Sequence, residues 1–170
     1  MRACVHPCVP PIVCASGIVG WLRFLSKAAL NFILAMNGRL GQQAHQSDWY
    51  QGQQLLEGLL EMLYDKGVKC NVIVTSHITY IGDEQNPEVG YPSTLGKALP
   101  PKVGRYFNTT LMVKTKGVGS SAQKVIYTSS IGKVELKNSA PTAVAKEYPL
   151  ATGLADYFRA VRQAGPQAQP

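Results

Sequence analysis

The chain has 170 residues, of which 45% are hydrophobic and 16% are charged. This length suits one domain with a sizeable core, and this composition excludes an intrinsically disordered protein. The formal net charge is +7, the isoelectric point is about 9.3, and most Lys and Arg residues follow position 96. A basic balance favours polyanionic partners such as nucleic acid, although an ordinary solvated surface can have the same composition.

Residues 1–21 form an atypical N-terminal segment. Three of the four cysteines, Cys4, Cys8 and Cys14, lie there, and their spacing matches none of the paired cysteine patterns of zinc sites. We therefore expect free thiols in a reducing compartment. The apolar run Val9–Leu22 is interrupted by prolines and is too short to span a bilayer, so we expect no membrane partner.

Two helices are predicted next. Apolar residues recur at helical spacing over residues 22–36 on more than one side, which predicts a buried helix that ends at Asn37-Gly38. A second helix is expected to begin near Asp48, which with Gln51 resembles a capping box, and to stop at Gly67. Its apolar stripe consists of Leu55, Leu56, Leu59, Leu60 and Leu63.

A short apolar run rich in β-branched residues, Asn71–Ser76, follows this helix. Such a run predicts a strand of a parallel sheet, buried on both faces. Ligands of open α/β sheets bind beyond the carboxyl ends of the strands, where Thr75, Ser76 and His77 are expected to lie. The residues alone leave open whether these three side chains form a site or an ordinary polar strand end.

The remainder of the chain predicts shorter elements. Residues 78–95 are expected to form a long functional loop, and Pro100-Pro101 to open a short helix that runs through Tyr106. Strands are expected at residues 109–114, 124–129 and 133–137, with the last two forming a hairpin through 130–132.

A last helix is expected to be capped by Thr152 and to end at Gly165-Pro166, before a disordered tail over 166–170. Its predicted apolar face consists of Leu154, Tyr157, Phe158 and Val161.

In this order of elements, three stretches carry a resemblance to a known family: Asn71–Ser76 ending at His77, Leu95–Val113, and Val134–Pro141. They resemble phage-encoded RecA-like ATP-binding proteins of the single-strand annealing and recombination type. The resemblance covers roughly residues 22–165. It implies an α/β, three-layer RecA-like P-loop NTPase core, incomplete at its N-terminus, with a C-terminal β-hairpin and helix.

The chain departs from this family at its nucleotide machinery. The P-loop G-x-x-x-x-G-K-[ST] is missing, since Gly96-Lys97 is followed by Ala98. By element order the family's Walker B strand falls at Ile18–Trp21, which lacks the acidic residue that organises magnesium. The chain is therefore expected to be either a fragment or a degenerate relative, and in both cases not to hydrolyse ATP alone.

The resemblance also implies roles for particular residues. His77 would be the polar sensor residue, and Lys137 would reach the nucleotide of a neighbouring subunit in a ring or filament. Thr75, Ser76 and Asn138 would contact nucleotide. ATP and Mg²⁺ are the cofactors of the intact family, whereas no metal ligand is assigned to this chain.

Single-stranded DNA is the partner that the resemblance implies, facing the loops at residues 38–47 and 78–95. Such binding uses cations and stacking aromatic rings. The candidate residues are Tyr80, Tyr91, Lys97, Lys102 and Arg105. Asp83, Glu84 and Glu88 make the second loop acidic, so a solvated flexible loop remains the alternative.

The resulting hypothesis is a RecA-like ATP-binding protein of phage DNA recombination or replication, in the cytoplasm of a bacterial host. The alternative, from another class, is a non-catalytic basic module that binds nucleic acid or supports assembly. ATP turnover by a chain with an intact P-loop would separate the two.

Overall fold

The computed structural model describes residues 17–19, 22–64, 71–83 and 85–165. It is mixed α/β, which confirms the class predicted from the sequence. The chain divides into two compact units, one of Met1–Thr79 with Pro92–Tyr106 and one of Tyr80–Tyr91 with Phe107–Pro170. The predictions for Cys4, Cys8, Cys14, Gly67 and the 166–170 tail lie outside the described residues.

In the first unit, strands β1 (Gly17–Val19) and β2 (Val72–Val74) pair in parallel, with Ile18 opposite Ile73. Parallel neighbours need a long crossover, and here it contains helices α1 (Leu22–Met36) and α2 (Gln46–Tyr64). The side chains of β2 are half-buried. The predicted strand is therefore present, but it is not fully buried on both faces as expected.

Helix α1 has the bounds that its apolar period predicted, and it ends as expected at Gly38. Gly38 has φ of +66°, a left-handed conformation that costs glycine no Cβ clash. The backbone N–H of Arg39 donates to the carbonyl of Leu34 at 2.7 Å, and that of Gly38 donates to Ala35 at 3.0 Å. These two bonds form a Schellman motif, which satisfies the last carbonyls of α1 and turns the chain toward α2.

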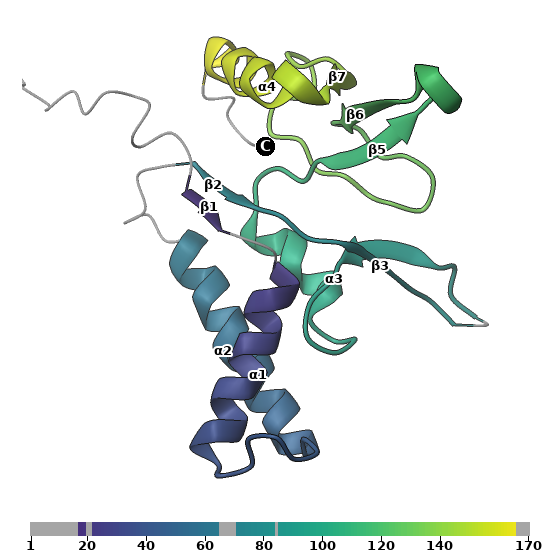
Figure 1. Cartoon of the computed structure of the whole chain (residues 1–170). Coiled ribbons are helices and arrows are strands. Elements are labelled where there is room, and N and C mark those ends of the chain that lie inside the picture. The colour runs from purple at the N-terminus through teal and green to yellow at the C-terminus, as the bar shows by residue number, and fades with distance from the viewer. Residues whose placement is uncertain (1–16, 20–21, 65–70, 84, 166–170) are drawn as a thin grey trace, which may run out of the picture. The chain divides into compact units, whose positions relative to one another are not determined.

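Helices α1 and α2 pack along each other as a hairpin (Figure 1). The packed side chains of α1 include Leu22, Ser26 and Ala29, and those of α2 include Leu56 and Leu60. The prediction that α1 is a buried helix is wrong for part of its surface. Three of its large side chains, Phe24, Phe32 and Met36, are exposed.

A segment of the first unit packs against α2. Pro100 opens the short helix α3 (Pro100–Val103), which continues into a 3₁₀ turn at Gly104–Tyr106, as the sequence predicted. The hydroxyl of Tyr106 donates to Glu57 Oε1 at 2.7 Å. Burial, and then this bond to the Glu57 carboxylate, raise the pKa of Tyr106 to about 12.

The predicted long loop at residues 78–95 is largely a hairpin. Strands β3 (Ile78–Ile81) and β4 (Val89–Pro92) form a two-stranded sheet. In its turn the Asp83 carboxylate accepts the backbone N–H groups of Gln85 at 2.9 Å and Asn86 at 2.7 Å. The backbone bond from Asn86, then that from Gln85, lower the pKa of Asp83. The loop prediction is wrong because, of the residues that suggested a loop, Gly82, Asp83 and Pro87 lie in the turn while Gly90 and Pro92 lie in β4.

The second unit contains an antiparallel sheet in the order β5-β6-β7, made of β5 (Met112–Lys116), β6 (Gln123–Tyr127) and β7 (Glu147–Pro149). The predicted hairpin between residues 124–129 and 133–137 is therefore wrong. Residues 133–137 instead make isolated bridges, Val134 to Gly90 and Lys137 to Thr110. Strand β6 takes partners on both sides, which leaves no edge for a third strand.

Helix α4 (Leu150–Ala164) completes the second unit. It begins at Leu150 after Pro149, so the predicted cap at Thr152 is wrong by one turn, whereas Gly165 ends it as expected. Tyr157 is the most deeply buried residue of its predicted apolar face, and it packs edge-on against Tyr148 and Phe158.

Candidate functional site

The carboxyl edge of the β1–β2 pair carries the residues that the sequence singled out. The backbone N–H of Leu22, the first residue of α1, donates to the carbonyl of Thr75 at 2.8 Å. The hydroxyl of Ser76 donates to the carbonyl of Ser93 at 3.0 Å. The backbone N–H of Ser93 donates to the carbonyl of His77 at 2.7 Å. Thr75–His77 are thus held between the start of α1 and Ser93.

The three side chains at this edge differ in accessibility. Thr75 and His77 are exposed, whereas Ser76 is half-buried and its hydroxyl already bonds backbone carbonyls. Packing of His77 in the core would have excluded a sensor role. His77 is exposed, so that role stays a prediction. Within the described residues, the buried hydroxyl of Thr94 has no hydrogen-bond partner.

The charge at this edge is set by α1. Its first turn holds no acidic residue, and its sequence includes Arg23 and Lys27 but no carboxylate. The N-terminal end of a helix carries partial positive charge from its unpaired N–H groups. The edge is therefore electrostatically suited to an anion.

Three of the five predicted DNA-binding residues follow Ser93 in the same unit. Lys97 and Arg105 are exposed, and Lys102 is half-buried in α3. Since Ser93 is bonded to Ser76 and His77, these cations belong to the chain segment that continues from the candidate site.

The other two candidates lie in the second unit. Tyr80, in β3, is half exposed, and Tyr91, in β4, is half-buried. Glu88 pairs with Lys133 at 3.0 Å, which offsets one acidic charge near these tyrosines, whereas Asp83 keeps its negative charge in the turn.

Lys137 and Asn138 also belong to the second unit. The Lys137 side chain is exposed, while its carbonyl accepts the N–H of Thr110 at 2.7 Å. Asn138 Oδ1 accepts the Ala140 N–H at 3.0 Å and the Tyr157 hydroxyl at 3.2 Å. Asn138 is thus part of a polar network around a buried tyrosine, and its nucleotide contact stays a prediction.

The sequence analysis missed that network. The Tyr157 hydroxyl also lies 3.0 Å from Thr109 Oγ1, which in turn lies 3.2 Å from Ser139 Oγ. A tyrosine at an apolar helical position is a weak signal for such a cluster, since buried tyrosine hydroxyls usually find a partner.

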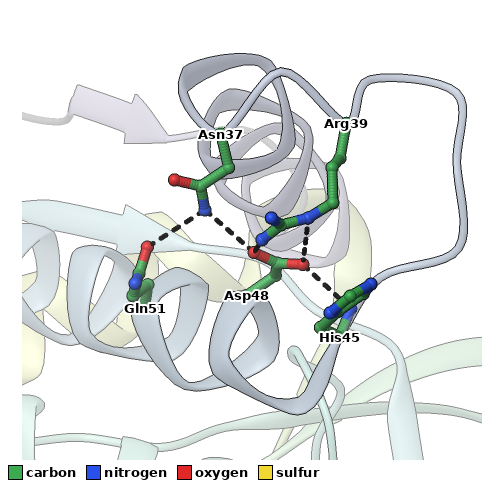
Figure 2. Close-up of polar contacts among 5 residues, drawn as sticks. All are labelled: Asn37, Arg39, His45, Asp48 and Gln51. Atoms are coloured by element: carbon green, nitrogen blue, oxygen red, sulfur yellow. Dashed lines mark hydrogen bonds and ion pairs between the residues drawn. The ribbon is translucent and has the colours of Figure 1, made fainter.

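A second missed cluster surrounds Asp48, which is fully buried (Figure 2). Arg39 bonds both carboxylate oxygens, with Nε 3.2 Å from Oδ2. Asn37 Nδ2 donates to Oδ1 at 2.9 Å, and the backbone N–H of His45 donates to Oδ2 at 2.8 Å. The bond from Arg39 is the largest cause that lowers the pKa of Asp48 to about 2.

The predicted cap at Asp48 is therefore wrong by three residues. Helix α2 begins at Gln46, and Asp48 reaches back to the N–H of His45, which is the carboxylate half of a capping box. With both oxygens engaged, this carboxylate is closed to ligands and holds the α1–α2 loop in place. The signal was present as an acidic residue in the first turn of the helix.

Comparison with known proteins finds no matching family model, no similar curated protein and no similar solved structure. In the described part of the chain, no helix has the length and apolar character needed to cross a membrane. The same residues hold no group of three or more His, Cys, Asp or Glu side chains placed for a metal ion.

Proposed function

We propose that this chain is a RecA-like nucleotide-binding protein of phage DNA recombination or replication that binds single-stranded DNA. The observation that carries the proposal is the parallel β1–β2 pair, with Thr75, Ser76 and His77 at its carboxyl edge beside the start of α1. Open α/β sheets bind nucleotides at such an edge.

The edge offers the groups that recognise phosphate. The Thr75 hydroxyl and the His77 ring are exposed donors. The positive end of the α1 dipole lies next to the Thr75 carbonyl, and no carboxylate in α1 opposes an anion there. ATP is the anion that the family resemblance suggests.

Binding without turnover is the expected activity of this chain alone. Its sequence has no phosphate loop, and its first 47 residues include no Asp or Glu that could organise Mg²⁺. These elements supply most of the electrostatic stabilisation in phosphoryl transfer. In a ring or filament of catalytically intact subunits, Lys137 would act on the nucleotide of its neighbour.

Each unit by itself offers candidate contacts for single-stranded DNA. Tyr80 and Tyr91 offer rings for stacking on bases, and Lys97, Lys102 and Arg105 offer cations for phosphates. The alternative, a basic nucleic-acid-binding or assembly module without nucleotide, is favoured by the net charge of +7 alone.

Two titrations separate these functions. Binding of a fluorescent ATP analogue and of a labelled oligothymidylate is followed by anisotropy at several salt concentrations. We expect both ligands to bind, and we expect Thr75→Val and His77→Ala to weaken only the nucleotide. His45→Ala is the matched control, because His45 is also exposed and only its backbone makes a hydrogen bond to Asp48.

The outcomes have distinct meanings. Binding of DNA without nucleotide would establish the alternative module. Loss of nucleotide affinity in His45→Ala equal to that in His77→Ala would remove the β2 edge from the site, and binding of neither ligand would refute both functions.

A further inference from the structure

Helices α1 and α2 expose large apolar side chains that soluble helices usually bury. The exposed fraction is 65% for Phe24, 54% for Phe32 and 71% for Met36 on α1, and 44% for Leu55 and 68% for Met62 on α2. Apolar residues normally form the stripe that faces the core. Here a second stripe accompanies the packed one on each helix.

The two exposed stripes point to the same side of the hairpin. Successive helical residues advance by about 100°, which places Phe32 and Met36 beside the packed stripe of α1, and Leu55 and Met62 beside that of α2. Because the helices run antiparallel, with Leu30 next to Gly52, these two flanks face one way. We call this surface the apolar face.

The opposite side of the hairpin is partly covered, although Tyr50 and Tyr64 of α2 are exposed there. An alanine Cβ at Gly52 would lie 2.9 Å from Leu95 Cδ2, Gln53 Nε2 donates to the carbonyl of Leu95 at 3.1 Å, and Tyr106 bonds Glu57. Gln53 and Glu57 lie on the other flank of α2, and Gly52 lies in its packed stripe. Among the described residues of the first unit, the segment that packs on the hairpin thus leaves the apolar face open.

The apolar face carries no charge. The charged residues of the two helices outside the Asp48 cluster, namely Arg23, Lys27, Glu57 and Glu61, fall on the other side by helical position. The other residues that share its flanks include Leu25, Ala28, Ala35, Gly58 and Leu59, together with the polar Gln51. Nothing on this face selects a partner of opposite charge, and nothing on it repels a copy of itself.

The size of the apolar face suits a protein interface. At about 200 Å² for each large side chain, Phe32, Met36, Leu55 and Met62 together offer roughly 470 Å² to solvent. The largest apolar patch of a typical monomer is roughly 300–600 Å² and is often functional. A standard interface buries about 800 Å² on each partner, so these four residues supply more than half of that area.

We propose that the apolar face binds the apolar face of a second copy of this chain, so that two α1–α2 hairpins form a four-helix bundle. A two-fold axis pairs each surface with itself, which an uncharged surface permits. Helices of 15 and 19 residues are about 22 and 28 Å long, enough for bundle packing over several turns. The inference does not depend on the proposed function.

Sedimentation equilibrium of the full chain tests the proposal. We expect a species of twice the 18.4 kDa mass of one chain that dissociates on dilution. Phe32→Asp and Met62→Asp should each raise the dissociation constant by about 100-fold or more, because the dimer would bury unpaired carboxylates. Val118→Asp is the matched control, since Val118 is 88% exposed and lies in the second unit.

Other outcomes overturn the proposal. A chain that stays monomeric at high micromolar concentration, or that is monomeric but pellets with phosphatidylcholine vesicles, assigns the apolar face to something other than a second copy. Dimers of unchanged affinity in Phe32→Asp and Met62→Asp place the interface elsewhere, and a mass that grows without limit indicates a head-to-tail contact.

A measurement on the unmodified chain covers the case in which a variant does not fold. Amide hydrogen exchange in α1 and α2 should slow as concentration rises, while exchange in β5–β7 should not change. Exchange in α1 and α2 that is independent of concentration overturns the proposal.

Discussion

Gly52 and Gly58 lie on the same helix, yet replacing each by alanine should change stability in opposite directions. Alanine at an interior helical position stabilises by about 1 kcal/mol relative to glycine. At Gly58 nothing lies within 4 Å of the added Cβ. Gly58→Ala should therefore raise the free energy of unfolding of the first unit by up to about 1 kcal/mol.

At Gly52 the added methyl group meets a packed interface. Its Cβ would lie 2.9 Å from Leu95 Cδ2 and 3.4 Å from Leu30 Cα. The backbone of Leu30 cannot rotate away, and Leu95 is buried and holds the Gln53 amide through its carbonyl. Overpacking of this kind costs about 1–3 kcal/mol, so it outweighs the helical gain, and the net loss should be about 0–2 kcal/mol.

Urea unfolding followed by circular dichroism at low protein concentration measures both variants. The expected difference between them is about 1–3 kcal/mol, with Gly52→Ala the less stable. If Gly52→Ala is as stable as Gly58→Ala, the close approach of α1, α2 and Leu95 is wrong.

Three further predictions concern buried polar groups. The lowered pKa of Asp48 means that its contribution to stability is present above its unfolded pKa of 3.8 and is lost as pH falls toward about 2. Urea midpoints should therefore drop between these pH values, and Asp48→Asn should flatten the drop. Tyr106 behaves in the opposite sense, because its pKa is raised from 10.0 to about 12, so the first unit should lose stability as pH rises through this window. Tyr106→Phe should remove that loss, and a spectrophotometric titration that shows no late-ionising tyrosine would contradict it. Tyr157→Phe removes the hydroxyl shared with Asn138 and Thr109 and should cost about 1 kcal/mol in urea unfolding; an unchanged midpoint would show that this network does not stabilise the second unit.

The elements that the sequence predicted well are those with local causes. The bounds of α1 follow from an apolar period and from Gly38, which adopts the left-handed conformation that ends the helix. The short helix at Pro100 follows from the fixed φ of proline. The β-branched run around Val72–Val74 predicted a strand of a parallel pair, which β1 supplies.

Only the tertiary structure decided which segments meet. Strand β6 pairs with β5 and β7 instead of residues 133–137, because pairing partners are chosen by distant chain segments that no local pattern encodes. The same holds for Asp48, whose bond to the N–H of His45 is local but whose burial depends on Arg39 across the α1–α2 loop. Apolar spacing predicted that α1 would form a helix but not which of its sides would be covered. The hydrophobic effect is non-directional, so an apolar period does not specify which side of a helix will find a partner. In the structure α2 covers one side of α1, and Phe32 and Met36 stay exposed.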